Sequence, residues 1–284
     1  MTDKFADWIG RESRHTQRIA AAPVAALAAT LDMDEAPGIG SALPPGWQWL
    51  FFNPIVRRSQ LGDDGHPRRG DLLPPIALPR RMWAGSRIRY LAPLLVGALA
   101  TRTSRILRTV EKTGKTGALC FVTVAHTIAS EGLDCIVEEQ DIVYRDGVGP
   151  SPATAAPSPA APVAAQWTRT LTTDPTLLFR YSALTSNGHR IHYDLPYARD
   201  VEGYRGLVVQ GPLMATLLQG LALACRPGEP MSAFEFKGVN PLFVGAALTL
   251  QAWPDAAGGI ALRALDAQGI LAMQASARWP EAAP

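Results

Sequence analysis

Apolar and polar positions alternate along several short stretches of the chain and follow a helical period along others. Alternation bounded by Gly or Pro predicts strands at 99–106, 118–128, 247–253 and 270–279. Amphipathic spacing over 5–31 predicts a helix that breaks or restarts at Pro23. The run 213–225, opened by Pro212, is apolar nearly all round, which predicts a helix buried on every side.

The two halves of the chain resemble each other. Pro-Leu-Leu-Val-Gly-Ala at 93–98 returns as Pro-Leu-Phe-Val-Gly-Ala at 241–246. The strand-like stretches 99–106 and 118–128 then match 247–253 and 270–279, at offsets of about 150 residues. We interpret these matches as duplication of one unit. Chance is the alternative, because Ala, Leu and Val are common in this chain.

Composition divides the chain into two parts. Residues 147–165 are almost entirely Pro, Ala, Ser and Gly, which is typical of a semi-extended connector. We therefore predict an N-terminal hot-dog-like domain at 1–146, a linker at 147–166 and a C-terminal hot-dog domain at 167–284. One long buried helix held by a curled antiparallel sheet is the hot-dog arrangement, so the predicted class is α+β with a double hot-dog fold. The N-terminal half has no equal to the helix 213–225, and the Pro- and Arg-rich segment 65–83 stands in its place.

Charge and cysteine content narrow the setting. The formal charge of +2 over 284 residues argues against nucleic acid or a membrane surface as partner. The longest apolar run, 91–100, is too short to cross a bilayer, and 1–15 has no apolar signal core. Three cysteines without Cys-x-x-Cys spacing indicate a reduced, cytoplasmic setting.

A dense polar segment at 186–194 is the first candidate for chemistry. It contains Asn187, His189, His192 and Asp194. An imidazole beside a hydrogen-bonding partner suits acid–base catalysis. A metal site would need a third ligand besides the two histidines, and Asp194 is a weak one, so no metal is expected. A solvated loop is the alternative.

The glycine before the buried helix is the second candidate. The backbone N–H of Gly211 has no partner within the helix and lies at the positive end of the helix dipole. It can stabilise negative charge on a thioester oxygen, as enolate chemistry requires. A simple turn before a helix is the alternative.

Together the two segments resemble the MaoC-like and R-specific enoyl-CoA hydratases. That family places Asp-x-Asn-Pro-x-His before its hot-dog helix, and the corresponding residues here are 187–192. The stretch Ser182 to Tyr193 is similar to a subgroup that includes 3-methylfumaryl-CoA (mesaconyl-CoA) hydratase and fungal mitochondrial acyl-thioester dehydratases. Residues 206–213, 65–70 and 79–85 are similar to the same subgroup, which usually has His where this chain has Gln210.

The resemblance implies a role for each catalytic candidate. His192 is the expected base, and the Gly211 N–H is expected to hold the thioester oxygen. Asn187 stands where the family has Asp, and because an amide accepts no proton near neutral pH, we expect it to orient the water. Asp194 is a candidate for holding an imidazole, and His189 is a rival base.

Binding residues are expected in both halves. Eight arginines lie within 33 residues between Arg57 and Arg89, and arginine forks suit phosphates and carboxylates. A solvated basic face is the alternative. The candidates for binding substrate or CoA are Arg68, Arg69, Arg80, Arg81, Trp83, Arg190, Tyr193 and Gln210.

The expected activity is reversible addition of water to a short dicarboxylic enoyl-CoA, either 3-methylfumaryl-CoA (mesaconyl-CoA) or itaconyl-CoA, with citramalyl-CoA as product. Dehydration of a 3-hydroxyacyl thioester in fatty acid metabolism is one alternative. A hot-dog thioesterase or an inactive acyl-CoA-binding module are others. No cofactor is expected, because CoA is part of the substrate. We expect a homodimer, with a monomer as the alternative.

Overall fold

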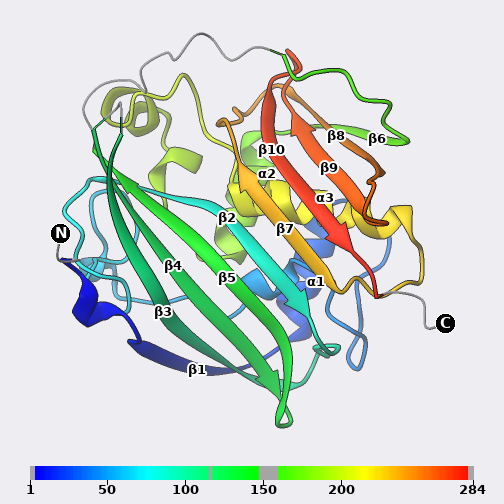
Figure 1. Cartoon of the computed structure of the whole chain (residues 1–284), viewed down its shortest axis with the longest axis horizontal. Coiled ribbons are helices and arrows are strands. Elements are labelled where there is room, and N and C mark those ends of the chain that lie inside the picture. Colours follow the sequence, from blue (N-terminus) through cyan, green and yellow to red (C-terminus); the bar gives the residue numbers. More distant parts are fainter. Residues whose placement is uncertain (1–3, 115–116, 147–158, 281–284) are drawn as a thin grey trace.

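The computed structural model describes residues 4–114, 117–146 and 159–280. One ten-stranded antiparallel sheet, in the order β1-β3-β4-β5-β2-β7-β10-β9-β8-β6, runs through the described chain (Figure 1). Its strands are β1 (Glu12–Arg18), β2 (Arg80–Tyr90), β3 (Leu99–Gly114), β4 (Gly117–Ser130), β5 (Leu133–Arg145), β6 (Trp167–Thr172), β7 (Ala233–Gly238), β8 (Ala247–Pro254), β9 (Ile260–Leu265) and β10 (Leu271–Arg278).

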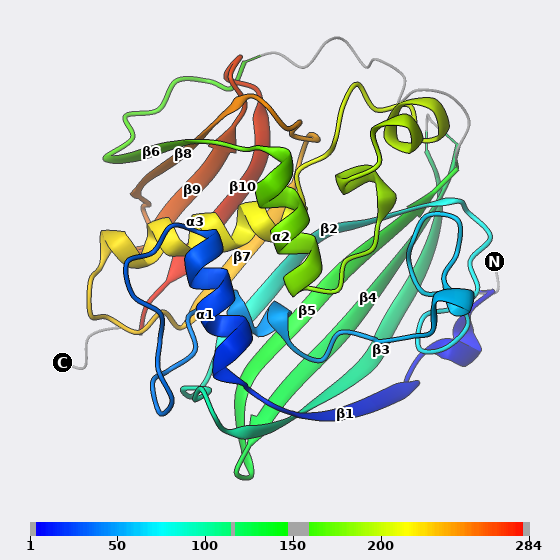
Figure 2. The same ribbon diagram turned by 180° about the vertical axis from the view of Figure 1, so that it is seen from behind.

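The helices lie together on one side of the sheet (Figure 2). The α-helices are α1 (Ala21–Thr30), α2 (Pro175–Leu184) and α3 (Gly211–Cys225). Short helical turns are η1 (Ala6–Trp8), η2 (Trp47–Leu50), η3 (Arg58–Gln60), η4 (Arg190–His192) and the π-helical η5 (Tyr197–Val201). None of the helices in the described ranges is both long and apolar enough to cross a membrane.

The sheet consists of two matching halves that meet at β2 and β7. From each outer edge inward, the strand order is β1-β3-β4-β5-β2 in one half and β6-β8-β9-β10-β7 in the other. Residues Gly85–Arg89 pair with Ala233–Lys237 across the join. Two such units in one continuous sheet form a double hot-dog, which confirms the predicted fold class.

The repeated hexapeptide confirms the duplication. Leu95 and Phe243, at the same position of the repeat, each form an isolated bridge, with Ala42 and Val208 respectively. The glycines that follow, Gly97 and Gly245, both have positive φ, 94° and 90°. The second predicted match is wrong, because sheet order makes β4 equivalent to β9, whereas β10 is equivalent to β5.

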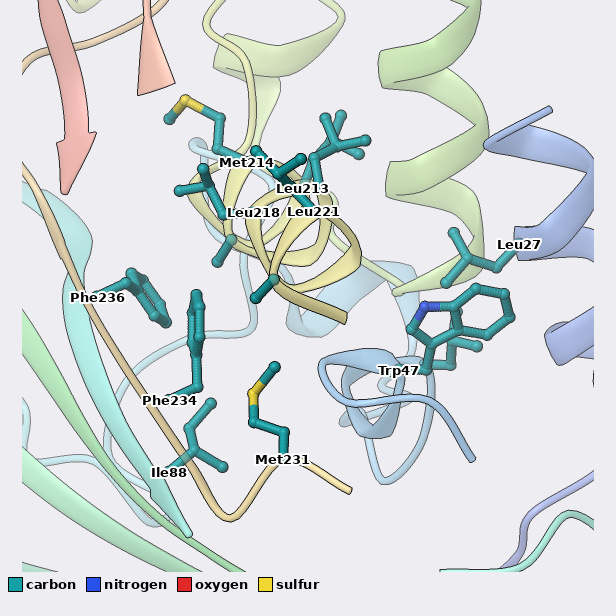
Figure 3. Packing of buried hydrophobic residues seen from close by; sticks show 14 of the residues in the cluster. Leu27, Trp47, Ile88, Leu213, Met214, Leu218, Leu221, Met231, Phe234 and Phe236 are labelled. Atoms are coloured by element: carbon teal, nitrogen blue, oxygen red, sulfur yellow. The ribbon is translucent and has the colours of Figure 1, made fainter. Parts of the chain in front are cut away.

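Helix α3 fills the concave side of the C-terminal half. Pro212 stands in its first turn, where a missing N–H costs no hydrogen bond. Leu213 and Leu218 are fully buried, and the side chains of α3 face Phe234 and Phe236 of β7 (Figure 3). Each such side chain contributes about 1.5–3 kcal/mol when removed from water. The predicted buried helix is confirmed.

The N-terminal half lacks this helix, as expected. Leu43 donates its N–H to Leu94, as Val209 does to Leu242, so the two chains enter the helix position in the same way. In the N-terminal half Pro44 and Pro45 follow, and the chain makes only the short turn η2. The remodelled segment therefore begins at residue 44, well before the predicted 65–83.

The single long helix predicted over 5–31 is wrong in its first part. Residues 12–18 form the edge strand β1, paired with Leu99–Arg105 of β3. Nearly every side chain of β1 is exposed, so apolar alternation gives no strand signal there. The helix restarts at Ala21, two residues before Pro23, as the sequence indicated.

The predicted linker is described only in part. Residues 147–158 lie outside the described ranges. Residues 159–166 run along the C-terminal half, where Pro159 bridges Ile270 and the Ala161 carbonyl accepts a 2.7 Å hydrogen bond from Arg263.

Replacing Leu218 with Ala tests the role of α3 in the core. The side chain is 0% exposed, so its loss should lower the free energy of unfolding by about 2–5 kcal/mol. Urea denaturation measures this change. The matched control is Leu133→Ala, at a position 64% exposed, which should cost less than about 0.5 kcal/mol. Equal effects would contradict the assigned packing.

Candidate active site

A tight turn between α2 and η5 carries the predicted catalytic residues. Helix α2 ends at Leu184, and Ser186 adopts a left-handed conformation with φ 50°. The Asn187 side-chain carbonyl then accepts the N–H of His189 at 3.1 Å, which starts η4. His189 and His192 are therefore turned inward, only 6% and 7% exposed.

His192 lies at the start of α3. Its Nδ1 is 2.7 Å from the carbonyl oxygen of Val208, three residues before Gly211. Burial lowers the pKa of His192 to about 3, so the ring is neutral at working pH. A carbonyl can only accept, so Nδ1 carries the proton and Nε2 keeps its lone pair. This is the form that a general base requires.

Gly211 is the first residue of α3, so its N–H has no partner in the helix. Pro212, the next residue, supplies no N–H. The carbonyl oxygen of Trp83 in β2 lies 4.0 Å from the position that a Cβ on Gly211 would occupy. The first residues of β2, around Trp83, therefore border the expected oxyanion site.

The structure assigns the partner of the second histidine differently from the prediction. His189 Nε2 lies 2.9 Å from the carboxylate of Glu202, and both side chains are less than 10% exposed. Asp194 binds no imidazole, because one of its oxygens accepts from Arg190 at 2.7 Å and the other from the Tyr197 N–H. The sequence prediction for Asp194 is wrong, and Glu202 was missed.

A loop from the N-terminal half completes this site. Its His66 ring lies 4.5 Å from the His189 ring, centroid to centroid, and His189 lies 5.6 Å from His192. The loop packs so closely that a Cβ on Gly65 would overlap the Gly188 carbonyl. Burial, followed by the charge of Arg81, lowers the pKa of His66 well below its usual value. Sequence reasoning quoted 65–70 as a motif but did not select His66.

One group of these residues has metal-ligand geometry. Asp64, His66 and His189 each offer a ligand atom, and these atoms lie within 4.8 Å of one another. However, the positive charges of Arg81 and Arg69 disfavour a positive charge on His66, and they would repel a metal cation in the same way. We therefore assign no metal to this group.

Several predicted binding residues are held by the protein itself. Gln210 is 0% exposed and donates to Leu178 and Ser182 of α2, so it joins two helices instead of facing a ligand. Arg190 binds Asp194 and the Asp63 carbonyl. Both residues therefore hold neighbouring segments of the site in place through hydrogen bonds.

The N-terminal arginines differ from one another. Arg69 donates to the carbonyl groups of Ile76, Leu78 and Pro79, which fixes the segment before β2. Arg68 is exposed and donates only to the Leu61 carbonyl at 3.3 Å. Arg80 and Arg81 are half-buried and form no ion pair within the described ranges.

A cavity of about 340 Å³ borders the catalytic turn on its outer side. Tyr193, which donates to the Gly188 carbonyl at 3.0 Å, is 51% exposed at its edge. The lining residues are Phe179, Ser182, Ala183, Ser186, Asn187, Gly188 and Tyr193. Asn187 and Tyr193, both predicted site residues, thus reach open space.

A neutral, buried histidine lies beside the start of a hot-dog helix, as acid–base chemistry on a thioester requires. The family model of hydroxyacyl-thioester dehydratase type 2 matches residues 46–244, and the chain belongs to that family. It is 49% identical over 249 residues to the mesaconyl-C(4)-CoA hydratase of Chloroflexus aurantiacus, covering 87% of this chain and 88% of that one.

Solved structures show the same fold. A MaoC-like dehydratase from Phytophthora capsici superposes with a TM-score of 0.66 and 14% identity, over 100% of both chains. A Mycobacterium tuberculosis protein described as a double hot-dog superposes with a TM-score of 0.54 and 16% identity, over 95% of this chain and 96% of that one.

Acid should destabilise the fold through three buried histidines. Burial lowers the pKa of His66, and it lowers the pKa of His126 and His192 to about 4 and 3. Below pH 6.5 these three histidines bind protons in the unfolded chain but not in the folded chain. The free energy of unfolding therefore decreases as the pH is lowered. Burial raises the pKa of Glu138, so this residue holds a proton in the folded chain that it lacks in the unfolded chain. That opposite effect cancels the contribution of at most one histidine.

The free energy of unfolding should therefore drop by about 4 kcal/mol between pH 7 and pH 5. Urea denaturation at several pH values measures it. The control is His126→Gln, which removes one titrating group without touching the catalytic turn and should make the slope shallower. Constant stability over this range would contradict the neutral, buried state of the rings.

Proposed function

We propose that this protein adds water reversibly to a short dicarboxylic enoyl-CoA, with mesaconyl-CoA as the leading substrate and citramalyl-CoA as product. The observation that carries the proposal is the placement of His192 and Gly211 at one helix start, with the imidazole held neutral and its proton on Nδ1. The relationship to the Chloroflexus hydratase supports the dicarboxylic substrate.

The proposed reaction uses the groups at the start of α3 in sequence. Nε2 of His192 takes a proton from water as the water oxygen bonds to the β-carbon. The double-bond electrons move to the thioester oxygen, where the Gly211 N–H stabilises the negative charge. The imidazolium then returns the proton to the α-carbon, which restores the thioester. The reverse steps remove water.

Asn187 fits the role of orienting the water. Its side-chain oxygen is occupied by the His189 N–H, so the amide NH₂ is the group left to bind a water oxygen. An amide that donates to the water leaves proton transfer to His192. Glu202 fixes His189 beside the reacting ring, which favours His189 as a supporting group over a rival base.

The other candidate activities have less support. A plain 3-hydroxyacyl-thioester dehydratase would use the same groups in reverse, and the family name favours it as the second candidate. A thioesterase would need an acid or base on the helix, and α3 carries none. Its Gln219 accepts a 2.5 Å hydrogen bond from Tyr90 and lies fully buried.

We also propose a cytoplasmic location and a homodimer. The three cysteines are free, which suits a reducing compartment. The homodimer follows the general preference of soluble oligomers for two-fold symmetry. A monomer would already hold the complete ten-stranded sheet.

Replacing His192 with Ala should lower kcat by about two to four decades while the affinity for CoA thioesters changes little, because the ring serves proton transfer. Loss of the conjugated enoyl-thioester absorbance measures turnover. The control is His15→Ala, on the exposed edge strand, which should keep full activity. A variant at position 192 that keeps more than about a tenth of kcat would refute the role.

A panel of enoyl-CoA thioesters tests the substrate class. Mesaconyl-CoA should be hydrated with much higher kcat/KM than crotonyl-CoA, which has no free carboxylate. Equal kcat/KM for crotonyl-CoA would instead favour the plain 3-hydroxyacyl-thioester dehydratase.

A further inference from the structure

The first residues of β2, from Arg80 to Trp83, lie beside the expected oxyanion site. The Trp83 carbonyl borders Gly211, and Arg81 precedes Trp83 by two residues on the same face of the strand. Two strand residues span about 7 Å. The end carbons of a trans four-carbon chain are about 3.8 Å apart, as for any trans three-bond path. A second carboxyl group on a thioester held at Gly211 is therefore within reach of the strand residues next to Trp83, among them Arg81.

Arg81 is surrounded by polar groups rather than by acids. It pairs with Tyr144 of β5 in the sheet register, and its charge acts on both Tyr144 and His66. The Tyr144 side chain is 0% exposed, and burial raises the pKa of its hydroxyl, while a hydrogen bond with the Arg81 side chain lowers that pKa in part. The Arg69 guanidinium covers the Tyr144 ring at 5.1 Å. The Arg81 guanidinium and the Tyr144 hydroxyl therefore form a pair of hydrogen-bond donors on one face of the sheet.

Arg81 has no carboxylate partner among the residues that the structure describes. Other arginines of this region form salt bridges within the protein. Arg87 pairs with Glu139 and Asp141, and Arg190 pairs with Asp194. Arg81 forms no ion pair with any residue in the described ranges. The nearby Asp64 carboxylate accepts the His66 backbone N–H. A half-buried cation without a carboxylate partner is suited to bind one from a ligand.

We propose that Arg81, with the Tyr144 hydroxyl and the His66 ring beside it, binds the free carboxylate of the substrate and selects dicarboxylic over monocarboxylic enoyl-CoA. This assignment rests on the proposed hydratase function. It gives the remodelled N-terminal half a chemical task, since all three residues come from that half, whereas His192 and Gly211 come from the other.

The test compares substrates that differ in the carboxylate. Arg81→Met should lower kcat/KM for mesaconyl-C4-CoA about a hundredfold or more, because a buried charge would lose its partner. Hydration of crotonyl-CoA should change less than about threefold, which also shows that the variant folds. Tyr144→Phe should give a smaller loss, about tenfold, again only for the dicarboxylic substrate. Arg81→Lys should recover part of the activity.

Saturated analogues give the same comparison without turnover. Inhibition by succinyl-CoA should weaken in Arg81→Met, while inhibition by butyryl-CoA should remain the same. The matched control is Arg169→Met, on the exposed outer strand β6, which should alter neither.

The outcomes separate the two proposals. A wild-type enzyme that hydrates no dicarboxylic enoyl-CoA overturns the proposed function itself. A wild-type enzyme that does so, with an Arg81→Met variant that affects both substrates equally or neither, overturns the carboxylate site and leaves the hydratase standing.

Discussion

The hydrogen bond between His192 Nδ1 and the Val208 carbonyl is the interaction on which the site depends. It joins the catalytic turn to the segment that enters α3, at a distance of 2.7 Å. It also fixes the proton on Nδ1, while burial keeps the ring neutral. In the proposed mechanism, this hydrogen bond allows the Nε2 lone pair of His192 and the Gly211 N–H to act on the same thioester.

Duplication of the hot-dog unit allowed the two halves to diverge. The C-terminal half keeps the buried helix and carries His192, the proposed proton-transfer group. In the N-terminal half, two prolines and the turn η2 replace the helix, and the freed chain supplies the loop around His66. That loop contacts the catalytic turn through Gly65 and Gly188, so the site is shared between both halves. A sheet continuous across β2 and β7 holds the halves in register.

The sequence predicted the local features of this protein and missed the distant ones. The placement of His192 beside the start of α3 was predictable, because motif and helix start lie within 20 residues of each other in the sequence. Glu202 and His66 were not, since their contacts depend on how remote loops pack. Asp194 was misassigned because Arg190, one helical turn before it, competes for the carboxylate. Strand β1 escaped detection because an exposed edge strand needs no apolar alternation.

Nitrogen-15 NMR of the histidine rings tests the central claim most directly. With His192→Gln used for assignment, the His192 ring should show a protonated Nδ1 and an unprotonated Nε2, unchanged from pH 8 to pH 5. The burial and the Val208 contact both require this state. A ring that is protonated on Nε2, or that titrates near pH 6.5, would contradict the account.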